Sequence, residues 1–332
     1  MKSGAFRGFS LSALFVSYAT GALFCASAAA QQQPYPVKPI RLIVPYPAGG
    51  SADLIGRAVN DGLAKRLGQP VIVDNRGGAA SIIGAEIAAR APADGYTLLV
   101  ATVATLAANP ALQRALPYHP ERDFAPVSML GSTPYLLAVH PTVPARSVAQ
   151  LIAHAKANPG KLNFGSAGVG TGGHLATELF RHMAGIDIVH VPYKGVSPAT
   201  ADVLGGQISL LLGGISVLKT HADGGRLRGL AVSTIKRSSI TPDIPTIDES
   251  GVKGYQSKSW NALVAPRHTP AAIIQRINSE LVAVLKSPQL SDQLKGLGIE
   301  PEPGTPAELT RYIREEIVRF RELIHAIGLK PL

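Results

Sequence analysis

The sequence predicts an α/β protein of two lobes, between which the chain crosses twice. Two observations support this fold class. Short apolar runs alternate with segments of helical periodicity, and this alternation starts twice, near residue 40 and near residue 133. The 332 residues are also enough for two hydrophobic cores, since chains of this length usually divide into domains. With 46% hydrophobic and 16% charged residues, the composition excludes a disordered protein.

Residues 1–30 have the three-part layout of a secretory signal peptide. Lys2 and Arg7 make the start positive, small and apolar residues dominate 9–26, and three alanines end at Ala30. We therefore expect cleavage near Ala30 and export to the periplasm. An uncleaved membrane anchor is the alternative, but Ser and Gly residues interrupt the apolar run, and a spanning helix needs about 20 apolar residues. Export argues against nucleic acid as a partner, despite a net charge of +10.

The first alternation predicts a parallel sheet with helices on both faces. Apolar strands are expected over 40–44, 70–73 and 97–100. One helix is expected to carry Ile55, Val59, Leu63 and Leu67 on one face and to stop at Gly68, and a second to span 81–91. Their βαβαβ order is typical of parallel sheets, because each crossover helix covers one face of the sheet.

The second alternation contains short strands separated by loops and helices. Ser147 and Gln150 have the spacing of a capping box, which predicts a helix start. A later helix carries Leu175, Leu179 and Met183 on one face. Strands are expected over 135–139, 162–164, 186–191, 208–212, 227–233 and 259–264.

The C-terminal part of the sequence is helical and has no strand of its own to pack against. One helix starts at Pro270, and a second capping box, formed by Thr305 and Glu308, starts the last helix. These helices must cover a sheet formed elsewhere, and we expect them to return to the sheet of the first alternation.

This return of the chain defines the two expected lobes. The first lobe comprises residues 34–134 and 258–332, and the second comprises residues 135–257. Trp260, the only Trp, lies in the strand predicted to make the second crossing, so we expect it at the hinge. The alternative is a Trp packed in the core of one lobe.

The first of three glycine-rich loops follows the first predicted strand. Gly49 and Gly50 let the backbone approach a ligand closely, and the helix that starts here presents unpaired N–H groups. These groups and the helix dipole favour a bound carboxylate. The alternative is an ordinary helix cap, with Ser51 at the N-cap and Asp53 in the first turn.

The second loop, residues 165–174, again lies between a strand and a helix. Gly168, Gly170 and Gly173 match the spacing of the dinucleotide-binding fingerprint. That interpretation needs an acidic residue at the end of the following strand, whereas Asp187 stands at its beginning. Capture of a small anion by the helix start fits better, and we expect no cofactor.

The third loop, residues 191–198, offers the hydroxyl and ring of Tyr193 and the cation of Lys194. The alternative for Lys194 is a solvated surface cation, which is the usual environment of lysine.

No convincing enzyme site is present in the sequence. Ser166, His174 and Asp202 could be combined into a triad, but no Gly-x-Ser-x-Gly sequence surrounds Ser166. The nine His residues lack the spacing of metal ligands, so no metal site is expected. A secreted hydrolase would need a nucleophile and a base within hydrogen-bond reach.

Short motifs follow one another in order along nearly all of the mature chain. They are Tyr35-Pro36, Pro39-Ile40, Gly49-Gly50-x-x-Asp53, Val73-Asp74-Asn75-Arg76, Asp94-Gly95-Tyr96-Thr97, Asn109-Pro110, Asp123-Phe124-x-Pro126-Val127, Gly165-Ser166-x-Gly168-x-Gly170-Thr171-x-x-His174, Pro192-Tyr193-Lys194-Gly195 and Asp202-x-x-Gly205-Gly206. Together they resemble the Bug-type proteins, the solute-binding subunits of tripartite tricarboxylate transporters. One departure is Gly-Gly-Ala-Ala-Ser at 77–81, where that family usually has Pro-Gly-Ala-Gly.

The resemblance implies a two-lobed periplasmic binding protein, type II-like, with each lobe a mixed sheet flanked by helices and a hinge of two crossing segments. It implies a clamp that closes on a small carboxylate-bearing solute, one carboxylate being held by backbone groups and ordered waters of two facing loops. The matching positions are Ala48, Gly49, Gly50 and Asp53 in the first lobe, and Ser166, Gly168, Thr171, His174, Tyr193 and Asp202 in the second.

The resemblance further implies a monomer that delivers its solute to a membrane transporter pair, without metal or cofactor. The alternative function is a sensing clamp that docks on a receptor, which would use the same fold. The sequence does not identify the acid.

Overall fold

The computed structural model describes residue 1, residue 4 and residues 35–328. The chain divides into two compact units, Met1–Val37 and Lys38–Leu332, and the architecture below is that of the second unit. All but residues 1 and 4 of the predicted signal peptide lie outside the described residues.

Among the described residues, no helix has both the length and the apolarity needed to cross a membrane.

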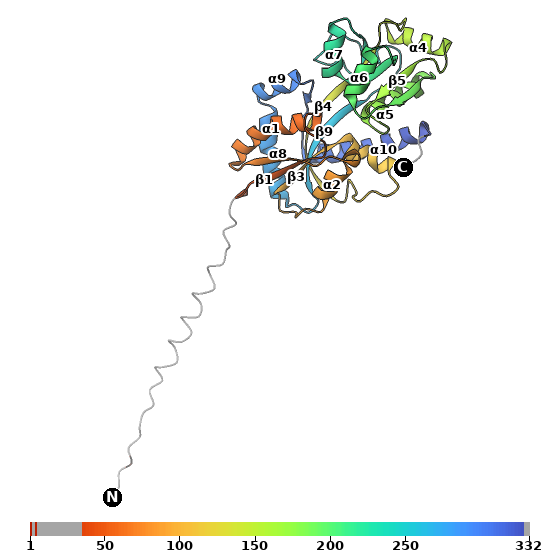
Figure 1. The fold of residues 1–332 in the computed structure, drawn as a ribbon. Helices are drawn as coiled ribbons and strands as arrows, with labels where there is room; N and C mark the ends of the chain where they lie inside the picture. The colour runs from red at the N-terminus through yellow and green to blue at the C-terminus, as the bar shows by residue number, and fades with distance from the viewer. Residues whose placement is uncertain (2–3, 5–34, 329–332) are drawn as a thin grey trace. The chain divides into compact units, whose positions relative to one another are not determined.

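The first lobe has the parallel strands that the sequence predicts. The order is β2 (Val71–Asn75), β1 (Ile40–Val44) and β3 (Thr97–Thr102), all parallel. Next come β9 (Lys258–Pro266), antiparallel to β3, and then β4 (Phe124–Val139), antiparallel to β9 (Figure 1). The sheet is therefore mixed.

The second lobe continues the same sheet. The order after β4 is β7 (Leu210–Gly214), β5 (Asn163–Ser166) and β6 (Val189–Pro192). β5 is parallel to both of its neighbours, β4 is antiparallel to β7, and β8 (Arg228–Val232) also pairs antiparallel with β4. The α/β fold with two lobes of mixed sheet is thus confirmed.

A single long strand, β4, makes the first crossing. Its 16 residues pair with β9 over Phe124–Pro134 and with β7 over Tyr135–Val139. The sequence predicted only the second half. Two prolines and several small residues interrupt the apolar pattern of the first half, and its ladder shows two register shifts.

The second crossing is tied to the first by the buried hydroxyl of Ser233. This hydroxyl accepts a hydrogen bond from the Tyr135 N–H (2.9 Å) and donates one to the Ser257 carbonyl (2.6 Å). The backbone N–H of Ser257 donates in turn to the Ser233 carbonyl (2.8 Å). Ser257 directly precedes β9, so one side chain joins both crossing segments.

The helices mostly follow the predicted periodicities. The last helix buries one apolar face, formed by Leu309, Ile313, Ile317, Phe320 and Ile324. The Thr305–Glu308 capping box forms completely, whereas the Gln150 side chain accepts from the Arg146 N–H, so only the Ser147 half of the other box forms. The elements are α1 (Ser51–Leu67), η1 (Ala79–Ser81), α2 (Ile82–Ala89), η2 (Ala104–Ala108), α3 (Asn109–Leu112), α4 (Val148–Ala157), α5 (Gly172–Ala184), α6 (Val196–Leu204), α7 (Ile215–Asp223), α8 (Ala271–Leu285), α9 (Pro288–Gly296), β10 (Glu300–Pro301) and α10 (Pro306–Ala326).

The C-terminal helices return to the first lobe as expected. Helix α8 lies against α1 and β4, and α10 contributes its apolar face to a cluster that includes residues of β1, β3 and β9. Separate clusters surround the second half of β4. One residue departs from this division: Leu175 of α5 is buried in the α10 cluster. The exact boundaries between the lobes stay a prediction.

Trp260 corrects the hinge prediction. Its backbone pairs with Ser132 next to the crossing, but its side chain is fully buried in the α10 cluster. The indole Nε1 donates to Glu316 Oε2 (2.8 Å), and the ring meets Tyr312 edge to face. Trp260 is therefore a core residue of the first lobe, and the hinge prediction is wrong for its side chain.

Replacing Ser233 with Ala tests the junction of the crossings. The variant leaves the Tyr135 N–H and the Ser257 carbonyl without this partner in a buried place, so we expect a loss of about 1–3 kcal/mol in unfolding free energy. Urea denaturation measures it. Ser279→Ala, which removes an exposed hydroxyl, is the control and should stay within about 0.5 kcal/mol of wild type. Equal effects of the two variants would contradict the role of Ser233.

Candidate functional site

The first glycine loop (residues 45–50) is held in shape by Asp53. This carboxylate is only 2% exposed and accepts hydrogen bonds from the Gly49 N–H (2.9 Å), Asn75 Nδ2 (2.9 Å) and Arg57 Nε (2.9 Å). Burial alone would raise the pKa of Asp53, but the bonds from Arg57, Gly49 and Asn75 outweigh it and lower that pKa. The carboxylate thus fixes the loop backbone while its charge is balanced by Arg57.

Helix α1 starts one residue earlier than it would if Ser51 were its N-cap. Gly50 is the N-cap, with φ −81° and ψ 169°, and Ser51 is the first helical residue. The alternative cap is therefore wrong for Ser51, although Asp53 does lie in the first turn. Among the described residues, no hydrogen bond occupies the backbone N–H of Ser51 or Ala52. This helix start keeps donors for a ligand.

The second glycine loop (residues 165–171) is also held by its own side chains. The Ser166 hydroxyl accepts from the Gly168 N–H (3.1 Å) and lies 2.7 Å from His190 Nε2. The Thr171 hydroxyl donates to the Gly168 carbonyl (2.8 Å). Gly168 has φ +128°, a backbone conformation that other residues rarely adopt. The sequence of this second glycine loop therefore favours one backbone conformation.

His174 also stabilises this loop, as a neutral hydrogen-bond acceptor. Its Nδ1 accepts from the Gly170 N–H (3.2 Å), and its ring lies 4.2 Å from that of His190, centroid to centroid. Burial, followed by the proximity of His190 and Arg181, lowers the pKa of His174 to about 4. Because it is neutral at pH 7, Nδ1 keeps the lone pair that the Gly170 bond requires.

Helix α5 begins directly after this loop and lies against the first lobe. Thr171 is its N-cap, and no hydrogen bond among the described residues occupies the N–H of Gly172 or Gly173. A Cβ at Gly172 would collide with the Tyr135 hydroxyl and lie 3.9 Å from Val103. Only glycine leaves room for this approach of the helix start to the crossing strand.

The third loop packs on the second. The Tyr193 N–H donates to the Ser166 carbonyl (3.0 Å), and the Tyr193 hydroxyl donates to Asp202 Oδ2 (2.7 Å). Burial and the Asp202 carboxylate raise the pKa of Tyr193 to about 12, so its hydroxyl stays protonated. Lys194 is exposed, which agrees with the solvated alternative.

The structure does not assemble the triad considered from the sequence. Ser166 is paired with His190, His174 with the Gly170 N–H, and Asp202 with Tyr193. Among the described residues, no hydrogen bond links the three. Ser166 does lie within hydrogen-bond reach of a base, His190 Nε2, at 2.7 Å, but no hydrogen bond among the described residues joins the His190 ring to a carboxylate. The described part of the chain also contains no group of three or more His, Cys, Asp or Glu side chains placed to hold a metal.

The sequence did not predict the backbone conformation of residues 77–81. Ala79, Ala80 and Ser81 have φ values of 46°, 51° and 79°, three consecutive left-handed residues without a glycine. A Cβ at Gly77 would lie 2.9 Å from Pro47 Cδ, so this segment packs on the first glycine loop. Such conformations are costly for alanine and serine, and no sequence pattern announces them.

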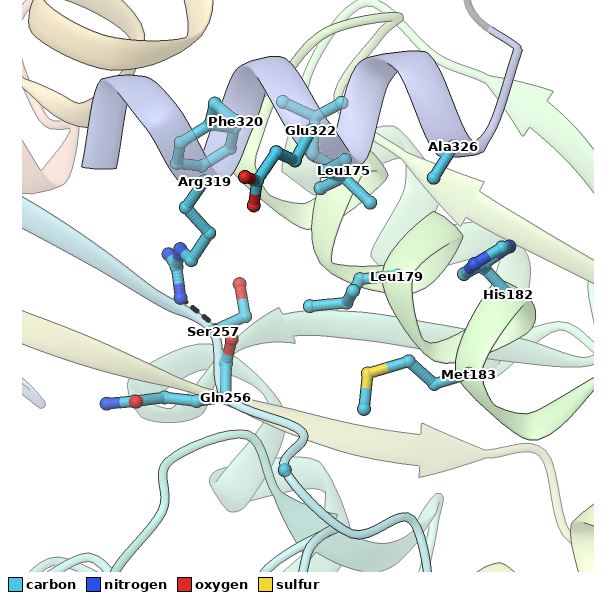
Figure 2. A pocket seen from close by; sticks show the side chains of 12 residues that line it. Leu175, Leu179, His182, Met183, Gln256, Ser257, Arg319, Phe320, Glu322 and Ala326 are labelled. Carbon is cyan, nitrogen blue, oxygen red and sulfur yellow. Dashed lines mark hydrogen bonds between the residues drawn. The ribbon is translucent and has the colours of Figure 1, made fainter. Parts of the chain in front are cut away.

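One cavity of about 340 Å³ lies elsewhere, between α5 and α10. Leu179, His182 and Met183 line it from α5, and Arg319 and Phe320 line it from α10 (Figure 2). None of the predicted site residues contributes to it. Its one cation is engaged, since Arg319 donates to the Gln256 carbonyl (3.0 Å) and pairs with Glu316. The anion site at the glycine loops stays a prediction from the sequence.

Comparison with known proteins identifies relatives over most of the chain. The family model described as "Tripartite tricarboxylate transporter family receptor" matches residues 55–329.

Solved structures agree with this match. The R. palustris protein Rpa4515 with adipate is 37% identical, covers 90% of this chain and all of its own, and has a TM-score of 0.81. The periplasmic binding protein BugD is 30% identical over 90% of this chain and all of its own, with a TM-score of 0.78. MatC of Rhodopseudomonas palustris with bound malate is 30% identical, with a TM-score of 0.76, over 87% of this chain and 100% of its own.

Buried His174 predicts a pH dependence. The unfolded chain binds a proton at this side chain near pH 6.5, whereas the folded protein does so only near pH 4. Unfolding therefore takes up a proton in this window, and stability should fall as the pH drops from 6.5 to 4. Thermal melts across this range should show a shallower fall for His174→Gln, which keeps an uncharged acceptor. Exposed His182→Gln is the control, and the same slope in both variants would contradict the prediction.

Proposed function

Because this chain belongs to the tripartite tricarboxylate transporter receptor family, we propose that it captures a small carboxylate-bearing solute between its lobes and delivers it to a membrane transporter of that class. The observation that carries this function is the pair of helix starts, α1 and α5. Each follows a glycine loop, and each has backbone N–H groups without a partner among the described residues. Such groups, reinforced by the helix dipole, stabilise a carboxylate without a charged side chain.

The relatives support a carboxylate as the recognised group. Adipate, bound to Rpa4515, and malate, bound to MatC, differ in length and in hydroxylation but share carboxylate ends. A site formed by backbone N–H groups suits such a range, because it recognises the carboxylate and leaves the rest of the solute to other residues.

We propose two kinds of role for the predicted site residues. The backbones of Ala48, Gly49 and Gly50, and of Gly168 and Thr171, approach the solute.

The polar side chains position these backbones. Asp53 bonds the Gly49 N–H, Ser166 the Gly168 N–H, and His174 the Gly170 N–H. The Tyr193–Asp202 pair holds the third loop. In this proposal these side chains act through the loops.

The proposed setting is the periplasm. The family's binding proteins work there, as BugD does, and the layout of residues 1–30 supports export with cleavage near Ala30. We propose a monomer as the working form and a membrane transporter pair as its partner. The proposed activity is binding, and the separation of Ser166, His174 and Asp202 into different hydrogen bonds supports that view.

Calorimetry with matched acids and esters tests the proposed function. We expect the purified protein to bind adipate or malate and not the corresponding diester, because neutral ester oxygens gain little from N–H donors arranged for a charge. Micromolar affinity corresponds to about −8.2 kcal/mol. Equal affinity for acid and diester would refute recognition through the carboxylate.

The glycine positions supply a second test. Gly168→Val should abolish binding while the protein stays folded, because valine does not tolerate φ +128° and the loop backbone must change to accommodate it. Ser166→Ala should weaken binding about tenfold or less, the loss expected for one neutral hydrogen bond. Calorimetric titration of both variants with the acid measures the two losses of binding. A larger loss for Ser166→Ala would reopen a chemical role for that hydroxyl.

A further inference from the structure

Asn261 of β9 carries a buried amide that nothing in the described part of the protein satisfies. Its side chain is 1% exposed, and neither Oδ1 nor Nδ2 has a hydrogen-bond partner. Most buried polar groups in proteins are paired, because an unpaired one loses its hydration without compensation. An amide that lacks partners for both its oxygen and its nitrogen therefore indicates a position where a bound group supplies them.

The register of the sheet places this amide beside the first glycine loop. Asn261 pairs with Thr102 at the carboxyl end of β3, and the Thr102 hydroxyl lies 3.5 Å from the hydroxyl of Tyr46 in that loop. Asn261 also pairs with Gly131, where a Cβ would lie 3.3 Å from Ile55 of α1. Paired residues share a face of the sheet, so Asn261 faces the start of α1.

A second unpaired group continues the same face toward the other lobe. Thr133 lies two residues beyond Gly131 on β4, is 6% exposed, and its hydroxyl has no partner. Two residues further on, the Tyr135 hydroxyl abuts Gly172 at the start of α5. Alternate residues of a strand share one face, so Gly131, Thr133 and Tyr135 form a strip between the two helix starts.

We propose that Asn261 determines solute specificity by hydrogen bonding a second oxygen-bearing group of the solute, with Thr133 beside it. This inference rests on the proposed function. While the loops hold one carboxylate, the amide, which both donates and accepts without net charge, takes a second carboxyl or a hydroxyl group. The two groups stay unpaired in the protein because the solute supplies their partners.

Matched acids that differ in one carboxyl group test this role. The pairs are adipate with hexanoate and succinate with butanoate, titrated calorimetrically into wild type, Asn261→Leu and Thr133→Val. The wild type should prefer a diacid over its monoacid by about tenfold or more, as expected where the monoacid leaves a buried polar group unpaired. Asn261→Leu should abolish this preference and keep the monoacid affinity, and the isosteric Thr133→Val should reduce the preference.

Thr241→Val is the matched control. It removes another buried hydroxyl without a partner, 5% exposed and outside the sequences of β4 and β9, and should leave the preference unchanged. Unliganded Asn261→Leu should melt at or above the wild-type temperature, because it removes an unsatisfied buried amide. A lower melting temperature, or an unchanged preference in a variant that binds, would overturn the role of Asn261 alone. If the wild type binds none of the four acids, the proposed function falls, and this inference with it.

Discussion

One strand belongs to both lobes, and the rest of the structure depends on it. β4 pairs with β9 over its first half and with β7 and β8 over its second, so the two halves of the sheet share a continuous backbone. The Ser233 hydroxyl then fastens the return crossing to the same strand at Tyr135. Because both crossings meet within a few residues, the helix starts of α1 and α5 are positioned from one short segment of sheet. The geometry of the proposed site is set there.

The loops at the site use their polar side chains on their own backbone. Asp53, Ser166 and His174 each accept a hydrogen bond from a glycine N–H of the loop they support. The proposed binding groups are backbone N–H groups, and these side-chain hydrogen bonds hold their loops in place without a solute. Preorganised donors of this kind need little ordering on binding, which favours affinity. The arrangement also explains how a site can suit an anion although its nearest charged pair, Asp53 with Arg57, is neutral overall.

The sequence was informative where local periodicity decides structure. The three parallel strands of the first lobe, the α1 start near Gly50, the capping box at Thr305 and the positions of the glycine loops all follow from short-range rules. Three features did not follow. The first half of β4 is stabilised by the strands that pair with it. The left-handed turn at Ala79–Ser81 is stabilised by tertiary hydrogen bonds. Asn261 is buried without a hydrogen-bond partner because of the strands that flank it, which are distant in sequence. The apolar stripe of α5 was recognised, but a periodicity cannot say which lobe covers it.

Leu175, on that stripe, has a mechanical consequence. It belongs to the sequence of the second lobe, yet it is 1% exposed and packs in the cluster of α10 and Trp260. Separating the lobes would withdraw this side chain into water, at a cost of about 1.5–3 kcal/mol. If the lobes separate as the proposed function requires, Leu175 leaves this cluster, so the contact stabilises the arrangement in which the lobes are together.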